Sequence, residues 1–543
     1  MLIDSLTRII QLVLADLGLD TVNLKGPYVD FTDDSRFGDL TTNIALRLSK
    51  SLKKPPVAVA SDIVNCIKKH LAEDVTGKYM QEVRIEGAGF INFYLSDAYF
   101  YEQLKEILIK KGDFARVDLG QGTRCLLEFV SANPTGPLSV AHARQAAVGD
   151  VLAHILTFLG YKVQREYYLN DEGNQINILG ESIQLRLKEL AGEKVDFPEN
   201  HYQGEYIYDI AREIKDKGLK IEDFSEYGVE YILAIIRKEL EDFGVGFDCW
   251  YSQRSLRESG KIEGALEFLR KNGFIYEEDK ATWFASKQFG DDKDRVVIKS
   301  DGAYTYLAPD IAYHQDKYKR GFSQLINLWG PDHHGYVNRL KASVRALGAD
   351  PDSLTIIIVQ LASIFRQGKL VQMSTRRGEY ITLREVLNEV GRDAARFFLL
   401  ARRTSSHLDF DLEVAKKQTP ENPVYYVQYA HARISSILRA SKTKIDVDRL
   451  DLTTLKEKAE MALIKQLCQF FPTLNVCLKT QDPYLLTVYL QEVAEAFHKF
   501  YDQHRVLGQD EMITQSRLAL IEATRITIAC ALELLGIGRP EHM

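Results

Sequence analysis

The sequence predicts an α/β protein whose central part is a doubly wound parallel sheet, followed by an all-helical region. A short apolar run at residues 126–130 leads through a Gly/Pro-containing loop into a helical pattern that begins near Ser139. Apolar strands then alternate with helices as far as about residue 405, which is typical of a parallel sheet covered on both faces. From residue 421 onward the apolar spacing is almost wholly helical, which indicates a separate bundle.

The elements outside the first unit follow from their local patterns. Before it, helical stretches precede a strand pair that turns within Glu-Gly-Ala-Gly-Phe. After it, three more strands are expected, at 163–168, 324–329 and 355–361. Long charged helices and two short strands indicate an insertion. The expected domains are 1–112, a smaller α+β domain; 113–420, the sheet domain, with an insertion at about 175–290; and 421–543, the helical bundle.

Composition excludes several classes of protein. The net charge of −7 argues against a general nucleic-acid binder, so any RNA contact must come from local patches. Six scattered cysteines without a CxxC pair give neither a disulfide framework nor the usual zinc spacings. No window has the roughly 18 apolar residues of a membrane span. The charged residues Asp4 and Arg8 break any apolar run at the N-terminus, so we expect no signal peptide. We expect a cytoplasmic protein without a bound metal.

The loop at residues 131–138 is a candidate anion site. A loop of this kind lays free N–H groups and the positive end of a helix against a bound anion. Ser139 is a suitable N-cap, and His142 falls in the first turn, close to any bound group. An ordinary strand–helix connection is an equally good interpretation of this pattern alone.

Three residues could form a site for a guanidinium group. Such a cation needs carboxylates placed for forked hydrogen bonds and a flat partner. Asp310, Tyr306 four residues before it, and Glu128 in the first strand supply these. The simpler interpretation of Asp310 is a helix-capping acid.

Three further segments carry polar side chains. Residues 166–175 end a strand in amides and acids, and by themselves indicate a loop with Asx turns. Asp332 and two histidines follow another strand; adjacent residues cannot all aim at one ion, so a crevice position is favoured over a metal site. Arg376 and Arg377 on their own indicate a surface turn.

Together these segments resemble class I aminoacyl-tRNA synthetases, in the form of the arginyl-tRNA synthetases. Residues 139–142, Ser-Val-Ala-His, stand where that family has His-x-Gly-His and keep the second histidine. Residues 372–376, Gln-Met-Ser-Thr-Arg, resemble the mobile Lys-Met-Ser-Lys-Ser loop that closes on ATP phosphates, with both lysine places altered. Residues 36–50 and 422–433 resemble the family's N-terminal extra domain and the start of its anticodon-binding bundle. Five motifs thus appear in the family's order, from end to end.

The resemblance implies a class I synthetase fold: a Rossmann-like doubly wound parallel sheet with an insertion, an N-terminal α+β domain that contacts the tRNA elbow, and a C-terminal all-α anticodon-binding bundle. It also implies site residues. The arginine side chain is expected at Glu128, Tyr306 and Asp310, and its α-amino group at Asn133. ATP is expected at Pro134, Thr135, Gly136, Ser139, His142, Gly330, Asp332, Gln372, Met373, Ser374, Thr375 and Arg376. Of these, Ser139, His142 and Arg376 are expected to be catalytic.

The implied function is ligation of L-arginine to its tRNA with Mg²⁺-ATP, by a monomer with no membrane or DNA partner. Family members generally activate arginine only with tRNA bound. Two alternatives remain open. An inactive tRNA-binding paralogue is suggested by Ser139, Ala141, Gln372 and Thr375. A class I synthetase for another amino acid is disfavoured because two acids facing a pocket suit a cation.

Overall fold

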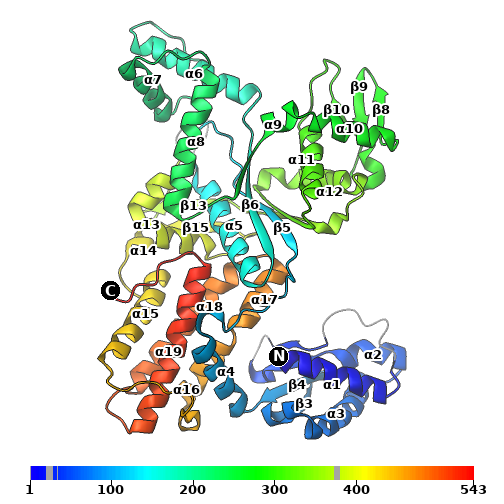
Figure 1. Ribbon diagram of the computed structural model, residues 1–543, viewed down its shortest axis with the longest axis vertical. Coiled ribbons are helices and arrows are strands. Elements are labelled where there is room, and N and C mark those ends of the chain that lie inside the picture. The colour runs from blue at the N-terminus through cyan, green and yellow to red at the C-terminus, as the bar shows by residue number, and fades with distance from the viewer. Residues whose placement is uncertain (1, 20–27, 33–34, 372–379) are drawn as a thin grey trace. The chain divides into compact units, whose positions relative to one another are not determined.

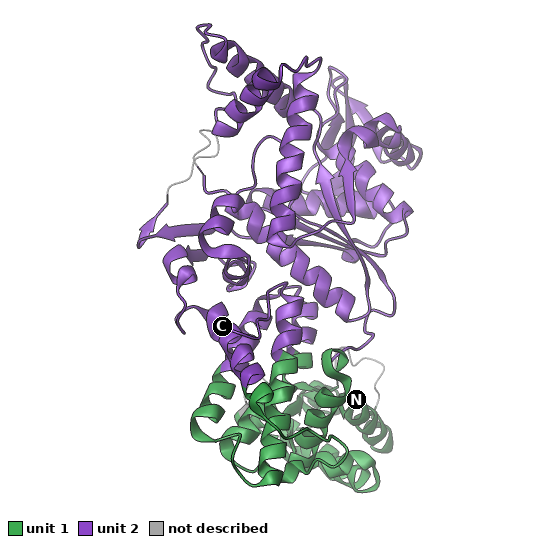
Figure 2. Ribbon diagram, turned by 60° about the vertical axis from the view of Figure 1, so that its left-hand side comes forward, with its two compact units in different colours: residues 1–114, 437–472, 495–527 green, residues 115–436, 473–494, 528–543 purple. Residues whose placement is uncertain are grey.

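The computed structural model describes residues 2–19, 28–32, 35–371 and 380–543. The chain divides into two compact units, shown in Figure 2. Unit 1 comprises residues 1–114, 437–472 and 495–527, and unit 2 comprises residues 115–436, 473–494 and 528–543. The residues of the last helices are therefore divided between the units.

Unit 1 contains a four-stranded antiparallel sheet in the order β1-β2-β4-β3. The strand pair expected near residues 82–95 is confirmed, and Gly87 and Gly89 adopt positive φ in its turn. The elements are β1 (Asp30–Phe31), β2 (Leu40–Thr42), β3 (Met80–Glu86), β4 (Phe90–Leu95), α1 (Leu2–Asp16), α2 (Ile44–Leu52), α3 (Pro56–Glu73), α4 (Asp97–Lys110) and α16 (Lys458–Cys468). Tyr101 on α4 donates to the carbonyl of Leu455, before α16, at 2.8 Å.

Unit 2 is built on a five-stranded parallel sheet in the order β12-β11-β5-β6-β7. Its strands are β5 (Arg124–Glu128), β6 (Lys162–Leu169), β7 (Cys249–Ser252), β11 (Gln324–Trp329) and β12 (Leu354–Ile358). The chain builds the sheet outward from β5 to β7 and then returns to the other side of β5 for β11 and β12. The predicted doubly wound sheet is therefore confirmed, with its switch point between β5 and β11.

The rest of the chain consists of helices and two small three-stranded sheets (Figure 1). The helices that precede the C-terminal region are α5 (Val140–Phe158), α6 (Asn174–Leu190), α7 (Glu205–Lys217), α8 (Phe224–Phe243), α9 (Gln253–Glu258), α10 (Lys261–Lys271), α11 (Leu307–Lys319), α12 (Val337–Ala346), α13 (Leu383–Leu400) and α14 (Leu412–Lys416). The C-terminal helices are α15 (Pro423–Ala440), α17 (Phe470–Thr480), α18 (Tyr484–Gln503) and α19 (Glu511–Leu534). The small sheets contain β8 (Ile275–Glu278), β9 (Ala281–Phe284), β10 (Arg295–Ile298), β13 (Ala362–Arg366), β14 (Lys369–Leu370) and β15 (Leu408–Asp411).

Helix α5 is the centre of the unit 2 core and is buried on nearly every face. It packs against β6 and α13. A Cβ added at Gly149 would lie 2.3 Å from Cγ of Phe129, so glycine allows the close approach. Asp150 forms an ion pair with Arg396 of α13 at 2.5 Å, and both side chains are fully buried.

Two expectations about domain boundaries need correction. Residues 249–252 lie within the expected insertion at about 175–290, yet they form β7 of the central sheet. This strand has only four residues, all half-buried, without alternation of apolar and polar positions, so its periodicity gives no strand signal. The C-terminal region is also not one separate packing unit, since residues 473–494 and 528–543 belong to unit 2. For example, the buried Arg396 donates to the Leu535 carbonyl at 2.8 Å.

Candidate active site

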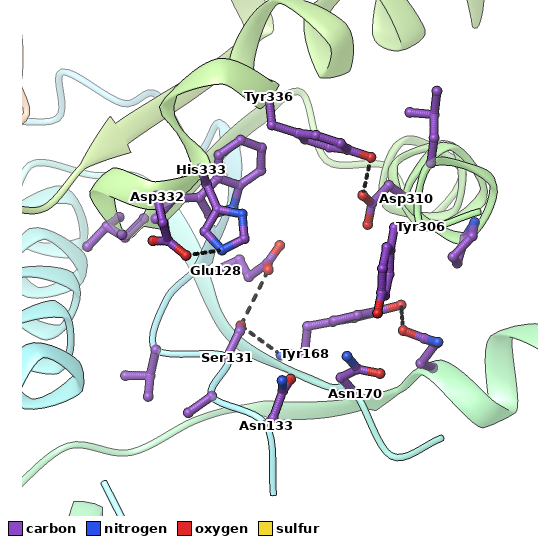
Figure 3. A pocket seen from close by; sticks show the side chains of 18 of the residues that line it. Glu128, Ser131, Asn133, Tyr168, Asn170, Tyr306, Asp310, Asp332, His333 and Tyr336 are labelled. Carbon is purple, nitrogen blue, oxygen red and sulfur yellow. Dashed lines mark hydrogen bonds and ion pairs between the residues drawn. The ribbon is translucent and has the colours of Figure 1, made fainter. Parts of the chain in front are cut away.

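A pocket of about 860 Å³ lies where β5, β6 and β11 end, at the switch point of the parallel sheet. A 3₁₀ turn, η5 (Pro331–Tyr336), follows β11 and forms part of its wall. Seven of the residues predicted from sequence line the pocket: Glu128, Asn133, His142, Tyr306, Asp310, Gly330 and Asp332. Figure 3 shows this pocket from close by.

Asp310 is the acidic group at the start of α11. Tyr336 donates a hydrogen bond from its hydroxyl to Oδ2 of Asp310 at 2.7 Å. Burial raises the pKa of Asp310 to about 7, although the Tyr336 hydrogen bond opposes the shift, and nearby Glu128 adds to it. Within the described part of the chain no lysine or arginine forms an ion pair with Asp310. The carboxyl group is therefore destabilised as an anion.

Glu128, at the end of β5, is already paired. Its Oε2 accepts a hydrogen bond from Nζ of the fully buried Lys317 at 2.5 Å, and Ser131 donates to Oε1 at 3.3 Å. Lys317 lies two turns after Asp310 on α11, so both side chains face the sheet. Sequence reasoning missed Lys317, because a lysine in the last turn of a helix is normally solvent-exposed.

Tyr306 is the aromatic residue at the pocket. It is 74% exposed, although it lines the pocket wall. Figure 3 shows that Tyr306 and Asp310 border the same space as Asn133 and Asn170. An accessible ring next to a half-buried carboxylate can stack on a planar cation that the carboxylate holds.

The backbone turns sharply where β5 enters the pocket. Val130 and Ser131 have φ values of 67° and 40°, which a β-branched or serine residue rarely adopts. The hydroxyl of Ser131 stabilises this turn, because it accepts the Tyr168 N–H at 3.1 Å and donates to Glu128. The turn directs the following Asn133 toward α6, where its amide donates to Oε1 of Gln175 at 2.6 Å.

His142 lies in the first turn of α5 and is half-buried. Burial lowers the pKa of its imidazole to about 4, so the ring is neutral at pH 7. Its Nδ1 accepts the backbone N–H of Ser139 at 3.2 Å. Because Nδ1 accepts, the ring proton resides on Nε2, which remains available as a donor in the pocket.

The other predicted residues divide into two groups. Pro134, Thr135, Gly136 and Ser139 belong to the adjoining loop but do not line the pocket. The predicted cationic loop, Gln372, Met373, Ser374, Thr375 and Arg376, lies outside the described residues. In the polar segment 166–175, Glu166 accepts two hydrogen bonds from Arg320, at 2.6 and 2.8 Å.

Several lining residues were missed by sequence reasoning. They are Tyr168, Asn170, Gln253, Arg295, Trp329, His333, Tyr336 and Arg339. Asn170 lies in the polar segment 166–175, and His333 follows Asp332, so both could have been found by counting residues past each strand end. Arg295 and Arg339 carry no such signal, because only folding brings β10 and α12 to this pocket.

Comparison with known proteins gives three matching family models. They are the arginyl tRNA synthetase N-terminal domain (residues 4–95), the class I (R) tRNA synthetase catalytic domain (residues 103–434) and the DALR anticodon-binding domain (residues 427–543). In the described residues, no helix has both the length and the apolar character needed to cross a membrane.

Individual relatives agree with these models. An arginine–tRNA ligase from Citrifermentans bemidjiense is 48% identical over 93% of either chain. One from Desulforamulus reducens is 42% identical over 99% of this chain and 98% of its own. The Thermus thermophilus arginyl-tRNA synthetase structure is similar in fold, with a TM-score of 0.78, 22% identity and full coverage of both chains.

Proposed function

The chain belongs to the class I arginyl-tRNA synthetases, and from this membership we propose how its own residues carry out the reaction. The protein is an arginine–tRNA ligase that uses ATP, L-arginine and tRNA. The observation that carries the proposal is one pocket that holds a half-buried acid without an ion-pair partner, Asp310, beside an accessible Tyr306 and a neutral His142.

In this proposal arginine binds with its guanidinium group on Asp310. The carboxylate accepts two forked hydrogen bonds, and Tyr306 covers the planar cation. Glu128 completes the acidic wall, with its charge balanced by Lys317. Asn133 holds the α-amino group, and Gln175 fixes the amide of Asn133.

ATP binds on the α5 side of the pocket. We propose that Nε2–H of His142 and the N-terminal end of α5 contact the phosphates, and that Gly330 and Asp332 contact the ribose. Pro134, Thr135, Gly136 and Ser139 support the phosphates from the loop, and residues 372–376, including Arg376, supply cationic charge. Mg²⁺ is expected to arrive with ATP, held chiefly by phosphate oxygens.

The reaction requires no protein nucleophile. An oxygen of the arginine carboxylate forms a bond to the α-phosphorus, and the bond from that phosphorus to pyrophosphate breaks. A terminal ribose hydroxyl of the tRNA then attacks the carbonyl carbon, loses its proton and displaces AMP. Catalysis consists of positioning and of stabilising the charge that grows on the phosphate. His142 is suited to the second task because it is a neutral, oriented donor.

Further parts of the proposal concern the whole chain. We propose that residues 1–112 contact the tRNA elbow and that residues 421–543 bind the anticodon, within a cytoplasmic monomer.

The direct test is charging of arginine tRNA with labelled arginine. We expect charging, together with ATP–pyrophosphate exchange that is negligible until the tRNA is added. Full exchange without tRNA would place this chain outside the general behaviour of its family. A chain that binds tRNA but never charges it would instead be an inactive paralogue.

The KM for arginine is expected to depend on pH through Asp310. The pKa of this group is about 7 in the free enzyme, and a bound guanidinium favours the carboxylate and lowers the pKa. Arginine binding therefore releases a proton, so KM is lowest above pH 7. KM rises as pH falls through 7, by up to about tenfold per pH unit. Initial rates at varied arginine between about pH 6 and 8.5 measure this. A flat KM profile would contradict it.

A further inference from the structure

The loop between β5 and α5, residues 131–138, is fastened by groups from distant parts of the chain. A buried loop carbonyl needs a hydrogen-bond donor, so a donor from outside the loop indicates which element holds it. Tyrosine hydroxyls supply three of these donors: Tyr167 donates to Ala132 O at 2.8 Å, Tyr206 to Thr135 O at 2.8 Å, and Tyr380 to Pro137 O at 2.9 Å.

Two of these hydroxyls, from separate parts of the chain, lie close to one residue. A Cβ added at Gly136 would lie 3.0 Å from the hydroxyl oxygen of Tyr206 and 3.3 Å from that of Tyr380. Tyr206 belongs to α7 in the inserted region, and Tyr380 directly precedes the segment that leads into α13. Burial raises the pKa of Tyr380 to about 12 and that of Tyr206 further, so both hydroxyls keep their protons and donate.

Helix α8 of the inserted region adds a further contact to the loop, from a carboxylate. Glu239 is only 3% exposed, and its Oε2 accepts the backbone N–H of Leu138 at 3.2 Å. The carbonyl of Leu138 in turn accepts the N–H of Leu383 at 2.7 Å. The N–H and the carbonyl of Leu138 are thus both bonded to groups outside the loop. Leu138 lies just before α5, the helix that carries His142.

We infer that Tyr206 and Glu239 of the inserted helices, together with Tyr380, are positioning residues for adenylate formation. They hold the Thr135–Leu138 backbone and the start of α5 in the arrangement that receives the ATP phosphates. The inserted region thereby acts on the chemistry through the loop, without touching either substrate. This inference rests on the proposed placement of ATP at the loop.

The test is removal of single hydroxyl groups. Tyr206→Phe and Tyr380→Phe are each expected to lower kcat/KM for ATP by about three- to tenfold, the effect of one lost hydrogen bond. The double variant is expected to lose about ten- to a hundredfold. KM for arginine should stay within about twofold, because Asp310 and Tyr306 lie outside the loop and Asn133 precedes the held Thr135–Leu138 segment, with its amide fixed by Gln175. Pyrophosphate exchange with tRNA present, at varied ATP and then varied arginine, separates the two effects.

Matched variants separate positioning from stability. Tyr208→Phe is the control on the same helix, since its hydroxyl bonds Glu189 at 2.8 Å on the inserted region's own surface. Glu239→Gln keeps an oxygen acceptor for Leu138 and should retain activity, whereas Glu239→Met should lower kcat/KM for ATP. The control should leave the kinetics for ATP and for arginine unchanged. The inference is overturned if Tyr206→Phe lowers only the melting temperature, or if it changes the kinetics for both substrates equally. If His142→Ala also leaves the ATP kinetics unchanged, the placement of ATP itself fails.

Discussion

The Asp310→Asn variant is expected to have a kcat/KM for arginine lower by two to three orders of magnitude. Asparagine keeps the shape of the side chain but removes the charge that a buried guanidinium requires. Loss of one partner of a buried ion pair costs about 3–5 kcal/mol, and each tenfold change in rate corresponds to about 1.4 kcal/mol. The steady-state rate of charging at varied arginine measures the loss, and KM for ATP should change far less.

Two controls sharpen this prediction. Asp316→Asn makes the same substitution on the same helix, at a carboxylate paired with Lys261 and Arg320, and should leave KM for arginine within about twofold. Citrulline has a similar shape but no charge, so the native enzyme should reject it. The Asp310→Asn variant should show a much smaller preference for arginine over citrulline. Near-native arginine kinetics in the variant would remove Asp310 from the site.

The second large effect is expected for His142→Ala, with a loss of about 10²–10³ in kcat, the scale of one preorganised donor. The neutral ring directs Nε2–H into the pocket because Nδ1 is occupied by the Ser139 N–H. Single-turnover formation of the adenylate, with tRNA present, measures the chemical step. With a pKa of about 4, His142 should not titrate between about pH 6 and 8, so the pH dependence there belongs to Asp310.

A variant on the same helix serves as the control. His154→Ala removes an imidazole whose Nδ1 lies 3.0 Å from the Leu534 carbonyl, away from the pocket, and should keep kcat within about threefold. An unchanged kcat in His142→Ala would exclude His142 from catalysis.

The departures from the family signature can be tested separately. Ser139→His with Ala141→Gly restores the usual tetrapeptide, and we expect it to change charging by less than about tenfold. In the native chain Ser139 already orients His142 through its backbone N–H, so a second imidazole adds little. If the native chain is inert and this double change switches charging on, the inactive-paralogue hypothesis is the correct one.

Much of the sheet could be predicted from local patterns. The strand at Gln324–Trp329 has the predicted bounds, and α5 follows directly after its predicted cap at Ser139. Both signals act within a few residues: apolar runs favour strands, and a capping side chain ends or begins a helix. The strand β7 was not predicted, because its four half-buried residues show no alternation of apolar and polar positions.

The sequence by itself determined the motifs and their order, and therefore the family and the pocket residues Glu128, Asn133, His142, Tyr306 and Asp310. Their chemical state depended on the tertiary structure. Lys317 pairs with Glu128 across 189 positions, which leaves Asp310 as the carboxyl group without an ion-pair partner in the described pocket. The physical reason is range: propensity and capping act between chain neighbours, whereas desolvation and ion pairing depend on every group that folding brings within a few ångströms.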